Sequence, residues 1–260
     1  MKPRVAVLCT IAAVSSLTVP VPSFAACEVR SGPKTAALVE LYTSEGCSSC
    51  PPADARLSQL RQSLGPTAEA VPLSLHVTYW DYLGWHDPFA KEAFVQRQNR
   101  LVQLNRHSTV YTPHFFVGGA ELSLQTQALS EKVRRVNALP AQADIQLKAN
   151  VNTADVLTVS ADATAQARPA RAALYLAVTE SGLTSRVTRG ENGGATLAHD
   201  YVVRAWVGPI RMNDGAVQVQ RDIALPPAWN RARLDLVAFV EDESTGAVLQ
   251  AVTAGRCAGS

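Results

Sequence analysis

The sequence lacks the short motifs that mark several common enzyme classes. It contains no G-x-S-x-G elbow, no Walker-type phosphate loop and no dinucleotide fingerprint, so hydrolase, nucleotide and nicotinamide functions have no support. It also has no internal repeat, no low-complexity tract and no long run of charge. What remains is a chain of 260 residues, which is enough for one large or two small globular domains.

An excess of charge of one sign is absent as well. The chain carries 24 basic and 22 acidic residues, and the two numbers become equal without Lys2 and Arg4, which we expect to leave with a signal peptide. A balanced chain has no electrostatic footprint for nucleic acid or for an anionic membrane surface. We therefore expect neither as a partner.

Residues 1–26 have the layout of a secretory signal peptide. A short basic start is followed by the apolar run VAVLCTIAAVSSLTV and then by prolines and small residues. The run is too short for a membrane span, so we expect cleavage near Ala25 or Ala26 and a mature protein in the periplasm or outside the cell. The alternative is a lipoprotein cleavage box at residues 24–27, which would make Cys27 a lipid-bearing first residue.

Cysteine is scarce, and its number is informative. The chain has five cysteines, of which Cys9 would leave with the signal peptide. An even number in an exported protein indicates disulfides, and four cysteines allow three pairings. The most economical pairing joins Cys47 to Cys50 and Cys27 to Cys257, so that the second bond ties the two ends of the mature chain.

The residues from Ala36 to about Leu139 alternate between strand and helix patterns. The apolar run AALVELYT is typical of a strand buried on both faces, and ADARLSQLRQSL places three leucines at helical spacing. VPLSLHVTYW predicts a second strand, and DPFAKEAFVQRQNRLVQLNR predicts a helix capped by Asp87. TPHFFVGGAEL predicts a hairpin and LQTQALSEKVRRVNAL a closing helix, which gives the order β-α-β-α-β-β-α.

From about Ala143 the pattern changes to short, often alternating segments separated by turn residues, such as RAALYLAVTE and RLDLVAFVED. Six or seven such strands predict an antiparallel β-sandwich. We therefore expect a signal peptide over residues 1–26, an α/β domain with the cysteine pair over 27–140, and a β-sandwich domain over 144–260.

The stretch EGCSSCPP places two cysteines between a buried strand and a helix. The backbone N–H groups at a helix start favour a thiolate, so a redox pair is one interpretation, with Cys47 partly exposed and Cys50 more buried. A structural disulfide is a second. A metal site is a third, although it needs further ligands; the candidates are His76, His86, His107 and His114. Our prediction assigns no metal ligands.

This element order, with CxxC after the first strand, resembles the thioredoxin fold. The resemblance implies that a cis-proline faces the cysteines, and Thr112-Pro113 stands at the matching place. It also implies a buried acid that passes a proton to the resolving cysteine, for which Glu40 is the candidate although its spacing is one residue longer. The fold class expected is an α/β thioredoxin-like domain followed by an antiparallel β-sandwich domain.

A closer resemblance covers nearly all of the mature chain. VELYTSEGCSSCPPAD, HVTYWDYLGWHDPF, YTPHFFVGG and RGENGGATLAHDYVVR together resemble the domain of unknown function 1223 family, which comprises exported bacterial proteins that are thioredoxin-like. The resemblance implies a fold, a compartment and a redox dithiol. It implies no established substrate.

An aromatic segment and one histidine are further candidates for binding. Trp80, Tyr82 and Trp85 lie in an aromatic segment after the second strand, which predicts either a lip for a partner polypeptide or a loop packed on the second domain. His114, next to Pro113, either tunes the thiolate or is an ordinary strand residue.

The segment RGENGGATLAHDYVV is either a long hairpin connection or a loop that folds Glu191, Asn192 and His199 back over the dithiol.

The function expected is that of a thiol–disulfide oxidoreductase acting on protein or small-molecule thiols and disulfides, without a cofactor. In this hypothesis Cys47 forms the mixed disulfide, Cys50 resolves it, and Pro113 shapes the substrate groove. The alternative is a non-catalytic binding module, or a copper- or zinc-handling protein, in which the cysteine pair is structural. The oligomeric state and the direction of electron transfer are not predicted.

Overall fold

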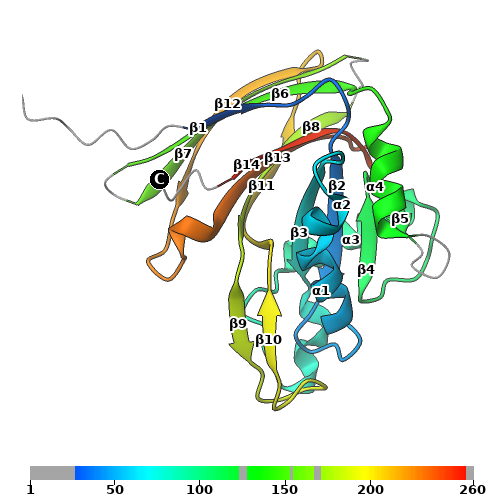
Figure 1. Ribbon diagram of the computed structural model, residues 1–260, viewed down its shortest axis with the longest axis vertical. Helices are drawn as coiled ribbons and strands as arrows, with labels where there is room; N and C mark the ends of the chain where they lie inside the picture. The colour runs from blue at the N-terminus through cyan, green and yellow to red at the C-terminus, as the bar shows by residue number, and fades with distance from the viewer. Residues whose placement is uncertain (1–26, 123–127, 153–154, 167–170, 256–260) are drawn as a thin grey trace, which may run out of the picture.

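The computed structural model describes residues 27–122, 128–152, 155–166 and 171–255. The predicted signal peptide and Cys257 lie outside the described residues. The protein is a mixed α/β structure that is mostly β-sheet (Figure 1). The elements of its first half, in chain order, are β1 (Cys27–Arg30), β2 (Ala37–Thr43), α1 (Pro51–Ser58), α2 (Leu60–Leu64), β3 (Ala70–His76), the 3₁₀ helix η1 (Thr78–Leu83), α3 (Glu92–Leu104), β4 (His114–Val117), β5 (Ala120–Leu122) and α4 (Leu129–Asn137).

The second half contains strands and one short 3₁₀ helix in its described residues. Its elements are β6 (Ala143–Val151), β7 (Val156–Ala165), β8 (Ala172–Glu180), β9 (Leu183–Arg186), β10 (Thr196–His199), β11 (Val202–Arg211), β12 (Ala216–Ala224), η2 (Arg231–Arg233), β13 (Leu234–Asp242) and β14 (Ala247–Gly255). Strands β9, β10 and β14 were not among the predicted strands. All three lie in segments with little hydrophobic alternation or with turn residues close by.

Apolar residues on both faces of β2 explain how helices cover the first half. Val39 and Leu41 face a core shared with α1, α2 and α4, whereas Leu38 and Tyr42 face a core shared with α3. Every residue of β2 is buried, as its continuous apolar pattern predicts. The helix predicted from Asp87 begins only at Glu92, with Lys91 as its N-cap residue. The prediction that Asp87 caps it is therefore wrong.

Two sheets pack face to face in the second half. Strands β1, β6, β7 and β12 form a four-stranded sheet, and β14, β13, β8 and β11 form part of an eight-stranded sheet. The alternating pattern of β6 and β7 buries every second side chain, and these side chains share one apolar core with β8 and β13. A β-rich second half is what the short alternating segments predict, but one sheet also takes in β1 and the other continues into the first half.

The larger sheet runs through both halves of the chain. Its strand order is β14-β13-β8-β11-β3-β2-β4-β5, and Val202 of β11 pairs in parallel with Ser74 of β3. The halves are also joined in the smaller sheet, where β1 from the first half pairs with β6 from the second half. The boundary near residues 140–144 stays a prediction, because a shared sheet does not decide whether each half folds alone.

A buried ion pair network joins the two halves behind β2. The Arg97 guanidinium donates to Glu40 Oε1 at 2.6 Å and to Glu241 Oε2 at 2.7 Å, and Arg100 binds the same Glu241 carboxylate. Burial disfavours the charge on Arg97, but the two carboxylates outweigh it and hold its pKa well above the ordinary value. The guanidinium also lies 5.1 to 5.2 Å from three ring centroids, those of Tyr175, Trp206 and Phe239.

Arg97→Met should destabilise the fold by about 3–5 kcal/mol, because it leaves Glu40 buried without its cation. The measurement is the free energy of unfolding in urea. The control is Arg135→Gln, which breaks an exposed i,i+4 pair with Glu131 and should cost at most about 0.5 kcal/mol. A loss below about 1 kcal/mol for Arg97→Met would show that the network is not essential.

Candidate functional site

The two cysteines of EGCSSCPP form a disulfide at the start of α1. Cys50 is the N-cap residue of α1, and the two prolines after it occupy the first helical positions, where their missing N–H groups matter least. Ser48 and Ser49 are exposed, but Cys47 and Cys50 are both fully buried. The prediction that Cys47 is partly exposed is therefore wrong, and the reason is the segment that covers the loop.

That segment is the cap hairpin, which we define as residues 183–199, comprising β9, β10 and the turn between them. It runs beside α1 and β3 (Figure 1). At its tip, Glu191 Oε2 accepts from the Ser48 N–H at 2.9 Å and from the Ser48 hydroxyl at 2.7 Å. Asn192 Nδ2 donates to the carbonyl oxygens of Glu45 and Cys47, each at 2.9 Å. Of the two alternatives for this segment, the structure has the one in which it folds over the disulfide.

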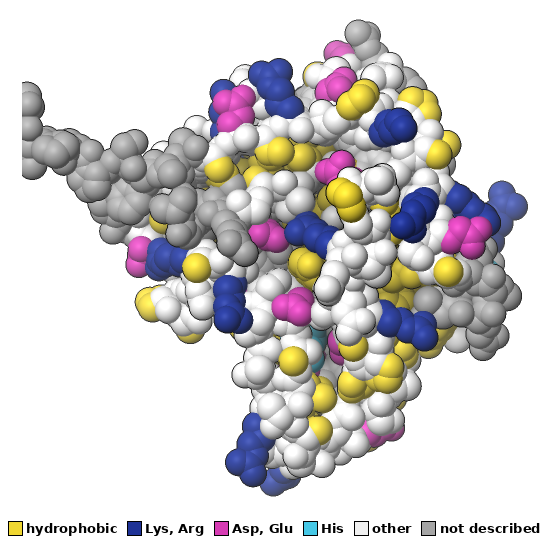
Figure 2. Space-filling view, in the orientation of Figure 1, with side chains coloured by type: hydrophobic (Ala, Val, Ile, Leu, Met, Phe, Trp, Pro, Cys, Tyr) yellow, Lys and Arg dark blue, Asp and Glu magenta, His cyan; other side chains and the backbone are white. Residues whose placement is uncertain are grey.

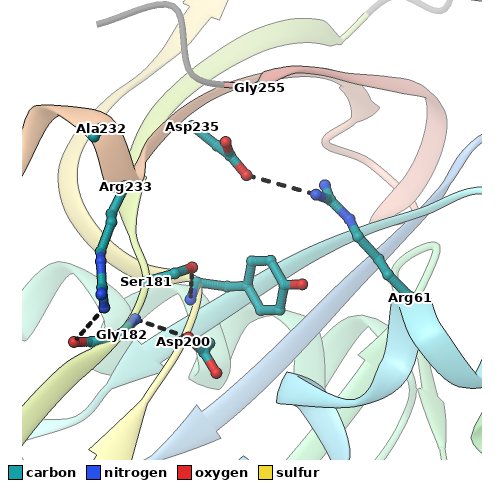
Figure 3. Close-up of a pocket in the computed structure, with 9 residues that line it drawn as sticks. Arg61, Ser181, Gly182, Asp200, Ala232, Arg233, Asp235 and Gly255 are labelled. Atoms are coloured by element: carbon teal, nitrogen blue, oxygen red, sulfur yellow. Dashed lines mark hydrogen bonds and ion pairs between the residues drawn. The ribbon is translucent and has the colours of Figure 1, made fainter. Parts of the chain in front are cut away.

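The cap hairpin is also held at its base. The Gly182 N–H donates to Asp200 Oδ1 at 2.8 Å, the Tyr201 N–H donates to Ser181 Oγ at 3.0 Å, and Arg233 Nη1 donates to the Gly182 carbonyl at 3.1 Å. These residues line a cavity of about 500 Å³ (Figure 3). Both ends of the hairpin are therefore fixed to the body of the protein.

Buried ionisable side chains lie next to the disulfide loop. Glu45, two residues before Cys47, is fully buried and lies 3.0 Å from His199 Nε2 through its Oε1. Its Oε2 accepts from Trp85 Nε1 at 2.8 Å. His76 and Asp87 form a second pair, with Nδ1 and Oδ2 2.7 Å apart. The rings of His76 and His199 pack edge to face, with centroids 5.1 Å apart.

The charges of this second pair support each other. Burial lowers the pKa of His76, but the Asp87 carboxylate outweighs that effect and the net pKa is raised. Burial raises the pKa of Asp87, but His76 and two backbone N–H groups outweigh it and the net pKa is lowered. Each member of the pair therefore favours the charged form of the other.

Asp54 of α1 is a further buried ionisable side chain near the disulfide loop. It lies one helical turn after Cys50, on the same side of the helix, and burial raises the pKa of its carboxyl group. Three buried atoms here have no hydrogen-bond partner in the protein: Asp54 Oδ1, His76 Nε2 and His199 Nδ1. Unpaired buried polar atoms are costly and are concentrated where chemistry or internal water needs them.

Two of the predicted groove residues, Trp80 and Thr112, also lie close to the cysteine loop. The Thr112–Pro113 peptide bond is cis, and Pro113 precedes His114, which pairs with Tyr42 near the end of β2. Trp80 Nε1 donates to Thr112 Oγ1 at 2.7 Å. The Trp80 side chain also packs against the disulfide loop, because a Cβ added to Gly46 would lie 2.9 Å from Trp80 Cβ.

Other predicted site residues have different surroundings. Glu40 binds Arg97 on the α3 side of β2. His114 is buried, stacks on Tyr111 with ring centroids 4.0 Å apart, and lies 3.1 Å from Glu121 Oε1; burial lowers its pKa. Tyr82 is 79% exposed. Thus Trp80, Trp85 and Thr112 lie close to the cysteine loop, whereas Glu40 and His114 make their contacts elsewhere.

Cys27 is disulfide-bonded, but Cys257 lies outside the described residues, so the Cys27–Cys257 pairing stays a prediction. Within the described ranges, no three His, Cys, Asp or Glu side chains are placed to hold one metal ion.

Two surface features concern possible partners. On the face shown in Figure 2, basic and acidic side chains are interspersed. None of the helices in the described part of the chain has the length and apolar character needed to span a bilayer.

Fold and site together define a mixed α/β protein, mostly β-sheet, with a CxxC disulfide under a hairpin. Residues 38–241 match the family described as "Protein of unknown function (DUF1223)", and the chain belongs to that family. No curated protein matches the chain.

Two solved structures are similar to this chain. One is protein AGR_C_4864 from Agrobacterium tumefaciens, with a TM-score of 0.62, 22% identity, and coverage of 86% of this chain and 95% of that one. The other is HBP35 of Porphyromonas gingivalis, with a TM-score of 0.66, 18% identity, and coverage of 86% of this chain and 76% of that one. At these identities the similarity concerns the fold alone.

Asp87→Asn should lower the pKa of the His76 imidazole, because burial remains while its closest carboxylate is lost. The check is an NMR titration of both proteins, with His86→Gln as a control that removes an exposed histidine. An unchanged His76 titration in Asp87→Asn would contradict the inference that Asp87 raises the pKa of His76.

The same substitution should change stability in a defined pH window. Because the pKa of His76 is raised in the folded state, its protonation stabilises the fold below pH 6.5. This stabilisation is lost as the pH rises through the pKa of His76 in the folded protein. Because the pKa of Asp87 is lowered in the folded state, its ionised form stabilises the fold above pH 3.8. This stabilisation is lost as the pH falls through the pKa of Asp87 in the folded protein. The advantage of wild type over Asp87→Asn should therefore be greatest between these two pH values. An advantage that grows towards alkaline pH would contradict this linkage.

Proposed function

We propose that this protein is an exported thiol–disulfide oxidoreductase whose redox group is the Cys47–Cys50 pair. The observation that carries the proposal is the CxxC disulfide at the start of α1, beside buried ionisable groups that include unpaired polar atoms. A helix start favours the thiolate form of a cysteine. A purely structural staple has no need of buried carboxylates and imidazoles next to it.

A thioredoxin-like build supports the same proposal. In the first half, β2, α1 with α2, β3, α3, β4, β5 and α4 follow the order expected for it. The loop after β2 carries the cysteines, and Pro113 precedes the neighbouring strand β4. These placements support an active site made of the cysteine loop and the residues around Pro113.

The proposed reaction uses the two cysteines in sequence. The Cys47 thiolate and one sulfur of a substrate disulfide form a mixed disulfide, and the other substrate sulfur leaves as a thiolate. Cys50 then attacks Cys47 Sγ, which releases the second substrate thiol and closes the bond seen here. In this proposal Thr112, Pro113 and Trp80 contact the substrate, because the Trp80–Thr112 hydrogen bond places these residues beside the loop.

The proton-accepting role belongs to Asp54 in this proposal rather than to Glu40. Glu40 is occupied by the Arg97 guanidinium, whereas Asp54 has an unpaired carboxylate oxygen and shares a helix face with Cys50. Burial raises its pKa, which makes it a stronger base than an ordinary aspartate. It can therefore take the proton from Cys50 before Cys50 attacks.

The rival proposal is a binding module in which the disulfide is a structural staple. The complete burial of both cysteines favours it. The reduction potential of the purified protein decides between the two. A value between about −120 and −270 mV is that of working oxidoreductases, whereas one below about −300 mV is that of a staple.

Cys50→Ser should trap mixed disulfides between Cys47 and partners in the exported fraction, because the step that releases them is lost. Mass spectrometry after non-reducing electrophoresis identifies them. Cys47→Ser is the matched control and should trap none. The absence of any adduct with Cys50→Ser would count against the enzyme.

Asp54→Asn should slow the release of a preformed mixed disulfide by about 100-fold. The wild-type rate should rise with pH as Asp54 loses its proton, at a pH above the ordinary 3.8, and the variant should lack that rise. Stopped-flow kinetics provides the measurement. Asp144→Asn, an exposed carboxylate on β6, is the control. Equal rates for wild type and Asp54→Asn would remove Asp54 from the mechanism.

A further inference from the structure

The carboxylate of Glu191 accepts a hydrogen bond from the backbone N–H of Ser48, the residue directly after Cys47. Its Oε2 accepts both from the Ser48 N–H at 2.9 Å and from the Ser48 hydroxyl at 2.7 Å. The two residues are 143 positions apart in the chain. An acid from the cap hairpin is therefore placed where hydrogen-bond donors near the helix start would otherwise be free to stabilise a thiolate.

The position of this carboxylate is fixed by its neighbours. Asn192 donates to the carbonyl oxygens on both sides of Gly46. Gly190 lies against the aromatic segment, since a Cβ added there would be 3.6 Å from Trp85 Cβ and 3.9 Å from Gly46 Cα. The hairpin base is held at the cavity of Figure 3. The carboxylate therefore has a defined place next to the cysteine loop.

Other ionisable groups also lie around the cysteine loop. They are Glu45 from the loop itself, Asp54 from α1, the buried pair of His76 and Asp87, His199 from β10, and Arg189 from the hairpin tip beside Gly84. Arg189 is exposed, and His76 is already paired with Asp87. Glu191 is the acid whose hydrogen bonds reach the residue directly after Cys47.

Glu191 is negatively charged at neutral pH. The hydrogen bonds from the Ser48 N–H and hydroxyl lower the pKa of its carboxyl group. When the disulfide is reduced, a thiolate on Cys47 forms beside this negative charge. Like charges at close range disfavour each other, so Glu191 opposes the stabilisation that the start of α1 offers to the thiolate.

We propose that the cap hairpin sets the direction of electron transfer, because Glu191 favours the disulfide over the reduced pair. Stabilising the reduced form makes a dithiol an oxidant, and destabilising it makes the dithiol a reductant. The natural substrate class is therefore a disulfide that this protein reduces. The inference rests on the proposed oxidoreductase function and adds its direction.

The electron balance of this direction is simple. Two electrons and two protons pass from the Cys47 and Cys50 thiols to the substrate disulfide, which leaves as two thiols, and the protein ends in the disulfide form described here. A separate dithiol reductant must return two electrons and two protons to the protein before the next turnover.

The first experiment measures the redox equilibrium of purified wild-type and Glu191→Gln proteins in glutathione buffers. At a fixed buffer ratio, Glu191→Gln should raise the ratio of reduced to oxidised protein by about threefold to tenfold, where tenfold corresponds to about 30 mV. Glu131→Gln, an exposed carboxylate on α4, is the matched control and should change nothing. The difference should shrink at about 1 M salt, because exposed charges are screened there.

The second experiment measures how fast iodoacetamide alkylates Cys47 as a function of pH, after reduction with a phosphine. The midpoint of this profile should move to lower pH in Glu191→Gln. If Glu191 acted only by holding the loop in shape, loss of its charge would leave the midpoint of the profile unchanged. Glu191→Asp, which keeps the charge, should retain the wild-type midpoint.

The outcomes separate this inference from the proposed function. An unchanged midpoint and an unchanged redox ratio in Glu191→Gln would overturn the role of the hairpin, as would a change in the opposite direction. If Cys50→Ser traps no partner, the proposed function fails. The alkylation profile still tests Glu191 in that case, because it requires only reduced protein and no substrate.

Discussion

The architecture depends on one buried cation, the guanidinium of Arg97. Arg97 comes from α3 and binds Glu40 of β2 and Glu241 of β13, so a single side chain connects the helical half with the strand-rich half. Three aromatic rings surround it, and they help to exclude water from charges that are paired inside the protein. The end of β2 carries the cysteine loop, so this network positions the site as well as the sheet.

The site itself is shared between the two halves. The α/β part supplies the disulfide, Asp54 and His76, whereas the cap hairpin supplies Glu191 and His199. The environment of the cysteines is therefore not set by the CxxC sequence and its helix alone. The charge next to Cys47 comes from a strand pair that belongs, by chain position, to the other half. This separation lets the cysteine loop and its electrostatic surroundings vary independently.

Hydrophobic pattern predicted the order of the main elements from Ala36 to Leu139, but not β1, and it predicted the main alternating strands of the second half. The number and spacing of the cysteines predicted the Cys47–Cys50 disulfide. Hydrophobic pattern failed where polar residues are buried. Arg97 reads as a surface residue of an amphipathic helix, and Asp87 before a proline reads as a helix cap, yet both are buried in ion pairs. Glu45 gave a local signal that was missed, because it lies two residues from Cys47 in an otherwise buried segment. The partners of these groups come from distant segments, and a single sequence does not reveal them.

The chain distance between the cysteines and their cover has a consequence for how the protein matures. A polypeptide is synthesised from its N-terminus, and early parts begin to fold first. The cysteine loop therefore emerges long before residues 183–199 arrive to cover it. Throughout that interval the two thiols are open to any oxidant, and the negative charge of Glu191 is not yet beside them. The nascent chain thus carries a more accessible cysteine pair than the finished protein does.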